Sequence, residues 1–125
     1  MPKITVCIDV PDKEKAIQFY TKGLGCELVK QNSDYVELNT DGLTIYLSKQ
    51  APGTNPLIQE KAVRSYERHW TPVHLDFIVS NIEECITTVL EYGGVKEGSK
   101  NGDWGSAVFC SDPFGNGFCI LEYNQ

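Results

Sequence analysis

The sequence has no long apolar run, and it is poor in positive charge. No stretch of its 125 residues approaches the roughly 18 apolar residues of a membrane-spanning helix, and the first ten residues lack the charged start and apolar segment of a signal peptide. Lysine and arginine number 11 against 17 acidic residues, which gives a net charge of −6. An anionic membrane surface or a nucleic-acid backbone would repel this charge. We therefore expect a cytoplasmic protein that binds neither.

Cysteine spacing that would indicate a disulfide framework or a zinc knuckle is also missing. The five cysteines are an odd number and include no CxxC pair, so reduced and mostly buried thiols are expected. Disorder is not expected, because aromatic residues reach 10% and charged residues only 22%. The length is that of one domain with a single core.

The two halves of the chain share one pattern, which is the most informative feature of the sequence. Ile4–Gly25 aligns with Val73–Gly94 without a gap. Each copy opens with alternating apolar and polar residues, typical of a half-buried strand, and continues into an amphipathic helix that ends at glycines. Asp12 is expected to cap the first helix, and the spacing of Ser80 and Glu83 predicts a capping box at the second.

Three short strands are expected after each helix, with Gly-containing turns before the last strand of each copy. The predicted strands are 26–30, 35–39 and 43–49 in the first copy and 95–97, 106–110 and 118–123 in the second. The predicted fold class is α+β, with βαβββ modules at about 1–50 and 72–125 in one domain. Each module is too small to cover both faces of its sheet, so we expect a mixed, strongly curved sheet around a shared cavity, with the helices on the outer face.

The alternation also predicts which side chains face this cavity. If the apolar positions lie under the helices, a mostly polar set is left for the inner face. Glu122 has the opposite parity and is expected on the outer face. A polar, enclosed surface of this kind is typical of a small-molecule site. The inner set includes Thr5, Glu37, Tyr46, His74, Asp76 and Cys119.

The connector, residues 51–71, holds the only arginines of the chain, Arg64 and Arg68. At about 20 residues it is longer than a passive link. Residues 57–69 contain no Gly or Pro, and Glu60 precedes Arg64 by one helical turn, so a short helix is predicted. On this helix the two arginines could clamp an anionic ligand at the cavity mouth, or they could be the solvated face of a linker helix.

Three segments, ITVCIDVPDKEKAIQFYTKGLGCEL, VHLDFIVSNIEECITTVLEYGG and FCSDPFGNGFCILEY, together resemble the vicinal oxygen chelate superfamily. That superfamily includes glyoxalase I, bleomycin- and fosfomycin-resistance proteins and ring-cleaving dioxygenases. The resemblance covers nearly the whole chain outside the connector and implies a homodimer. In metal-dependent members it implies four metal ligands, usually His or Glu. The corresponding positions here are Thr5, Tyr46, His74 and Cys119.

Only His74 among these four is a usual metal ligand of that superfamily, so we expect no metal or other cofactor. The alternative is a divalent ion such as Zn, Ni, Mn or Fe, held with the help of a sheet-facing acid such as Glu37.

These features favour a metal-independent binding protein of the glyoxalase/bleomycin-resistance type, which holds a small organic molecule, anionic or aromatic, between its modules. The alternative is an enzyme of the same superfamily, a glyoxalase-like lyase or isomerase or a dioxygenase, with His74 as the catalytic residue and an acidic partner. The sequence leaves open that His74 only bonds a neighbour and that Cys119 is a small buried hydrophobe. The expected ligand-binding residues are Thr5, Glu37, Tyr46, Arg64, Arg68, His74, Asp76 and Cys119.

Overall fold

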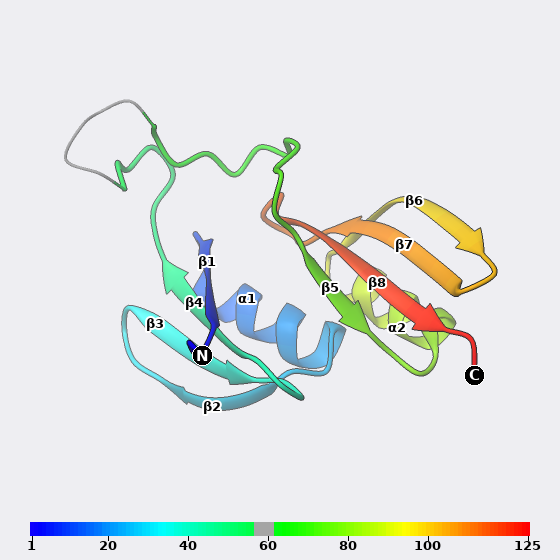
Figure 1. Ribbon diagram of the computed structural model, residues 1–125. Helices are drawn as coiled ribbons and strands as arrows, with labels where there is room; N and C mark the ends of the chain where they lie inside the picture. Colours follow the sequence, from blue (N-terminus) through cyan, green and yellow to red (C-terminus); the bar gives the residue numbers. More distant parts are fainter. Residues whose placement is uncertain (57–61) are drawn as a thin grey trace. The chain divides into compact units, whose positions relative to one another are not determined.

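The chain folds as two βαβββ modules, seen in a computed structural model that describes residues 1–56 and 62–125 (Figure 1). The chain divides into unit 1, Met1–Tyr66, and unit 2, Glu67–Gln125. The four strands of each module form a mixed sheet of their own. The predicted fold class, α+β with a repeated βαβββ order, is confirmed.

Unit 1 has the sheet order β1-β4-β3-β2, with β1 parallel to β4 and the other pairs antiparallel. The Asp12 side chain accepts a hydrogen bond from the Lys15 N–H and caps the helix, as predicted. The helix α1 contacts β3 and β4 and buries Ala16 and Ile17. Its last turn is π-helical, which the sequence pattern did not predict. The elements are β1 (Thr5–Val10), α1 (Lys13–Gln18), the π-helical turn η1 (Phe19–Gly23), β2 (Glu27–Gln31), β3 (Tyr35–Asn39) and β4 (Thr44–Lys49).

Unit 2 repeats this topology with the sheet order β5-β8-β7-β6. The capping box predicted at Ser80 is wrong, because the N-cap is Asn81, whose side chain accepts from the Glu84 N–H. The Glu122 carboxylate also accepts from the Ile82 N–H at 2.7 Å, so it lies on the helix-covered face, as predicted. The elements are β5 (Leu75–Ile78), α2 (Ile82–Glu91), β6 (Val95–Gly102), β7 (Gly105–Ser111) and β8 (Gly117–Tyr123).

The predicted alternation between the two faces of each sheet is present. On β3, Val36 and Leu38 are fully buried, and Glu37 between them is partly exposed. On β5, Asp76 is exposed and the following Phe77 is less so. The helix of each module covers the more deeply buried, apolar face of its sheet. The other face carries the more exposed residues, which in unit 2 include the apolar Ile78 and Phe109 as well as Asp76.

The thiols follow the expectation from the sequence. All five cysteines are free, and three of them are buried. Burial raises the pKa of Cys26 to about 11 and that of Cys110 to about 12, so both stay protonated at neutral pH. Among the helices that the structure describes, none is long and apolar enough to cross a membrane.

The helix predicted for residues 57–69 is wrong in its described part. Residues 57–61, which include Glu60, lie outside the described residues, and residues 62–69 form no helix.

Backbone pairing explains the extended connector. The Arg64 N–H donates to the Thr54 carbonyl and the Arg64 carbonyl accepts from the Gly53 N–H, both at 2.8 Å, so neither group is left for a helical bond. The Tyr66 hydroxyl donates to the Gln50 carbonyl at 2.7 Å. This part of the connector therefore belongs to unit 1.

The turn before β8 is organised by a buried aspartate. The Asp112 carboxylate is 2% exposed and accepts hydrogen bonds from the Phe114 N–H at 2.8 Å and from the Asn116 N–H and side-chain amide at 2.9 Å. Gly115 follows with a positive φ of 85°, which a glycine adopts without strain. The turn aims β8 back along β7.

We predict that Asp112→Ala lowers the free energy of unfolding by about 3 kcal/mol, because it leaves buried N–H donors without an acceptor. Urea denaturation followed by circular dichroism measures this loss. The matched control is Asp41→Ala in the exposed turn before β4, for which we expect a change below about 0.5 kcal/mol. Equal losses in the two variants would contradict the role given to Asp112.

Candidate functional site

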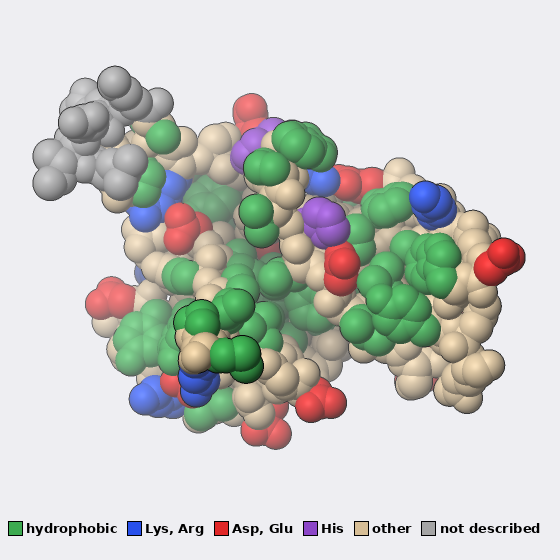
Figure 2. Space-filling view, in the orientation of Figure 1, with side chains coloured by type: hydrophobic (Ala, Val, Ile, Leu, Met, Phe, Trp, Pro, Cys, Tyr) green, Lys and Arg blue, Asp and Glu red, His purple; other side chains and the backbone are tan. Residues whose placement is uncertain are grey.

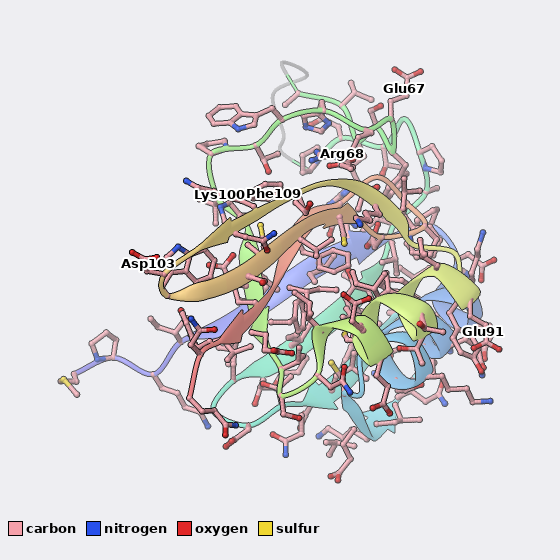
Figure 3. The ribbon with its side chains drawn as sticks, turned by 90° about the vertical axis from the view of Figure 1, so that its right-hand side faces the viewer. Glu67, Arg68, Glu91, Lys100, Asp103 and Phe109 are labelled. Atoms are coloured by element: carbon pink, nitrogen blue, oxygen red, sulfur yellow. The ribbon has the colours of Figure 1, made fainter. Side chains whose placement is uncertain are left out.

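Unit 2 contains a pocket of about 290 Å³ at strands β7 and β8, next to the segment that leads into β5. Figure 3 shows Arg68 on the side of the sheet away from α2, which carries Glu91. Hydrophobic side chains gather over β5, β7 and β8, with histidine and acidic side chains at their border (Figure 2). The lining residues include Arg68, Trp70, His74, Glu97, Phe109 and Cys119.

Strand register explains why residues distant in the sequence meet at this pocket. β5 pairs in parallel with β8, so that Asp76 lies directly opposite Cys119, and Cys119 in turn lies opposite Phe109 on β7. Paired residues on neighbouring strands project from the same face. His74 is two residues before Asp76 and shares its parity, so the four side chains lie on one face.

His74, Asp76 and Cys119 form a tight polar cluster, here called the HDC cluster. His74 Nδ1 lies 2.9 Å from Asp76 Oδ1, and the ligand atoms of all three residues lie within 4.8 Å of one another. Because a carboxylate only accepts, the proton of this bond belongs to Nδ1, and Nε2 of a neutral His74 is then an acceptor.

The Cys119 side chain is a thiol rather than a thiolate. Burial raises its pKa first, and the negative charge of Asp76 and a hydrogen bond to Asp76 raise it further. Cys119 is 8% exposed, and among the described residues no positive group lowers its pKa. It is therefore not activated as a nucleophile.

A bidentate ion pair lies at the other side of the pocket. Arg68 Nε donates to Glu97 Oε2 at 2.6 Å, and Arg68 Nη2 donates to Glu97 Oε1 at 2.9 Å. The hydrogen bonds from Arg68 hold the pKa of Glu97 below its ordinary value of 4.5. Sequence reasoning missed Glu97. It is the extra residue of a β-bulge between Lys96 and Gly98, and a bulge re-aims a side chain without changing the composition of a strand.

Gly117 leaves room for this arginine. A Cβ atom at Gly117 would lie 2.7 Å from Arg68 Nη2, which is too close for a non-bonded contact. Because Gly117, the first residue of β8, has no side chain, the Arg68 guanidinium can lie at the pocket wall.

Arg64 has a separate partner in unit 1. Its Nε donates to Asp9 Oδ2 at 2.8 Å, and its Nη1 donates to Thr54 Oγ1 at 3.2 Å. The predicted clamp required Arg64 and Arg68 to lie on one helix, and residues 62–69 form no helix. Each arginine is instead bonded to a carboxylate in its own unit.

The other predicted site residues lie on the sheet of unit 1. Glu37 is directly opposite Tyr46 in the β3–β4 pair, and the two rings of Tyr46 and Tyr35 meet edge to face with centroids 6.1 Å apart. Thr5 is exposed at the start of β1, opposite Thr44. The structure thus brings Glu37 and Tyr46 together in unit 1, and His74, Asp76 and Cys119 together in unit 2.

These donors do not match the four-ligand metal site that the superfamily implies. Of the four corresponding residues, Thr5 and Tyr46 offer neutral hydroxyls, His74 Nδ1 is bonded to Asp76, and Cys119 is held as a thiol. Such a site needs several charged or imidazole donors, and of the four positions only His74 offers one. Asp76, outside the four positions, supplies a carboxylate within 4.8 Å of the ligand atoms of His74 and Cys119.

Two βαβββ modules, each with a helix on one face of its sheet, define the architecture of the vicinal oxygen chelate proteins. Residues 5–121 match the profile of the glyoxalase-like domain, and the chain belongs to this family. The resemblance noted in the sequence is thereby confirmed.

Solved structures show the same fold at low sequence identity. A glyoxalase/bleomycin resistance protein from Albidiferax ferrireducens is 20% identical with a TM-score of 0.68, and the match covers 96% of this chain and 97% of that one. The fosfomycin resistance protein FosX from Listeria monocytogenes is 16% identical with a TM-score of 0.73, over 99% and 94% of the two chains. Among curated proteins, none shows a significant sequence match.

The Arg68–Glu97 pair predicts a pH-dependent loss of stability in Glu97→Gln. Since the pKa of Glu97 is lowered by folding, its stabilising effect is present above pH 4.5 and is lost as the pH falls through the lowered value. We expect the variant to be less stable by about 0.5–1 kcal/mol at pH 7. Thermal unfolding at a series of pH values should show this gap closing below pH 4.5. Glu91→Gln, exposed on α2, is the control and should show no such gap.

Proposed function

We propose that the chain binds a small organic molecule in the pocket of unit 2, and that this binding requires no metal ion. The observation that carries the proposal is the pocket itself, which combines aromatic side chains with a ring nitrogen and a charged pair. Trp70 is 80% exposed and Phe109 is 40% exposed, so both can contact a ligand. The volume of about 290 Å³ is near the lower end of small-molecule sites.

Charge narrows the class of ligand. Arg68 is already neutralised by Glu97, and Asp76 adds a negative charge beside His74. An anion would have to displace a carboxylate from Arg68 or approach the one at Asp76. We therefore propose an uncharged or cationic aromatic ligand, for which Trp70 and Phe109 offer stacking and cation–π contacts.

The membership in the glyoxalase-like family supports this proposal, since the relatives of known fold include proteins named for bleomycin and fosfomycin resistance. Proteins of this superfamily commonly form dimers, and we propose a cytoplasmic homodimer here. Light scattering on the purified chain should give twice the mass of one chain, and a monomer mass would contradict the dimer.

The second candidate is an enzyme of the same superfamily, a lyase, isomerase or dioxygenase. It is favoured by the 2.9 Å bond from His74 Nδ1 to Asp76, because this bond orients the imidazole and leaves Nε2 as a base. Mass spectrometry of a bound ligand after incubation separates the two candidates. If the chain is a binding protein, the mass of the ligand is unchanged after incubation. If the chain is an enzyme, a product of different or rearranged structure is detected, and Asp76→Asn slows its formation.

A ligand screen by thermal shift tests the binding site. We expect uncharged and cationic aromatic compounds to raise the melting temperature and aromatic carboxylates to have less effect. Phe109→Ala should weaken binding about tenfold, because it removes an aromatic contact of the pocket.

Trp104→Ala is the matched control, since Trp104 is also 40% exposed in unit 2 but contacts Tyr123 and does not line the pocket. It should leave the ligand-induced shift unchanged. Binding that survives Phe109→Ala and fails in Trp104→Ala would place the ligand elsewhere.

A further inference from the structure

The ion pair between Arg68 and Glu97 joins two parts of unit 2 that are far apart in the sequence. Arg68 lies in the segment before β5, and Glu97 lies on the edge strand β6, 29 residues away. Their side chains meet through hydrogen bonds of 2.6 Å and 2.9 Å (Figure 3). We call residues 67–71 the strap. We propose that Arg68 and Glu97 are positioning residues that attach the strap to β6 and so keep Trp70 at the pocket.

Trp70 needs such an attachment because its own side chain packs against little. The residue lines the pocket and is nevertheless 80% exposed. A ring exposed to this extent makes few van der Waals contacts that could hold it in one place. Its position therefore depends on the backbone of the strap. This inference rests on the ligand-binding function proposed above for the same pocket.

Hydrogen bonds within the strap connect the Arg68 guanidinium to the backbone of Trp70. Arg68 Nη1 donates to the carbonyl of His69, which belongs to the peptide bond between His69 and Trp70. A guanidinium held by its carboxylate partner thus fixes the peptide plane from which the indole extends. On the other side of Trp70, the Thr71 hydroxyl donates to the Val73 carbonyl at 3.0 Å.

Glu97 is itself attached to the sheet on which the strap lies. The hydrogen bonds from Arg68 lower the pKa of its carboxyl group most strongly, and a hydrogen bond from the buried Ser111 on β7 lowers it further. The carboxylate is therefore bonded to the sheet and to the strap at the same time. A bidentate pair with Arg68 fixes orientation as well as distance, which a single contact does not.

Gly117 offers a second way to disturb the ion pair, without removing either charge. A Cβ atom there would lie 2.7 Å from Arg68 Nη2 and 3.0 Å from its Cζ. Gly117 is not among the glycines with a positive φ, so its backbone accepts an alanine. The atoms that would have to move are the end of a long side chain. We therefore expect Gly117→Ala to fold and to displace the guanidinium.

Time-resolved fluorescence anisotropy of Trp70 tests the attachment without any ligand. The chain has two tryptophans, so Trp104→Phe leaves Trp70 as the single emitter. In this background the amplitude of the sub-nanosecond decay should rise about twofold or more in Glu97→Gln and in Gly117→Ala, because the strap loses its bonds to β6. Glu91→Gln, an exposed position on α2, is the matched charge control and should leave the decay unchanged.

A double-mutant cycle tests whether the ion pair acts on binding through Trp70. The probe is prodan, an uncharged naphthalene fluorophore, and stopped-flow fluorescence gives its dissociation rate constant. Glu97→Gln and Trp70→Ala should each raise this rate constant about five- to tenfold, and the double variant should be no faster than Trp70→Ala alone. A direct contact of Glu97 with the probe would instead give effects that add.

Either measurement can overturn the proposal. It is wrong if the Trp70 decay in Glu97→Gln equals that in Glu91→Gln, or if the two effects in the cycle add. Should circular dichroism show Gly117→Ala unfolded, Glu97→Gln decides, since its side chain is 29% exposed and its loss leaves the fold intact. If prodan does not bind the wild-type chain, this counts against the proposed ligand site, and the anisotropy comparison still decides the role of the ion pair.

Discussion

Parallel pairing between the first and last strands of each module is the contact on which the rest of the structure depends. β1 pairs with β4 and β5 with β8, and parallel neighbours need a long crossover connection, which in each module is a helix followed by two further strands. It also places Asp76 beside Cys119. Every candidate function of unit 2 rests on this register, since a slip by one residue would turn Cys119 toward α2.

Local ion pairs limit what the sheet faces away from the helices can bind. Both arginines of the chain are bonded to carboxylates, Arg64 to Asp9 and Arg68 to Glu97. The two ion pairs neutralise Asp9 and Glu97 locally and leave the net charge of −6 unchanged. What is left beside the pocket is Asp76, together with aromatic surface, and this combination favours ligands that are not anions.

Sequence reasoning succeeded where a local rule applied. The parity of β3 predicted that Glu37 faces away from the helix between Val36 and Leu38, and the parity of β8 predicted that Glu122 lies on the face that α2 covers. It failed where a single residue departed from regular geometry. The bulge at Glu97 cannot be recognised from the alternation of residues in its strand. The connector is extended because the backbone of Arg64 pairs with that of Thr54, and helix propensity does not take such a contact into account.

The sequence by itself determined the repeat, the α+β class and the alternation of faces along the strands, because these follow from periodicity and turn residues close together in the chain. The family was indicated by the resemblance of three segments and shown by the match over residues 5–121. Only the tertiary structure decided which groups meet. Arg64 binds a carboxylate 55 residues away and Arg68 one that is 29 residues away. Such partners depend on strand register and on the path of the connector, and both are fixed by packing over the whole module rather than by neighbouring residues.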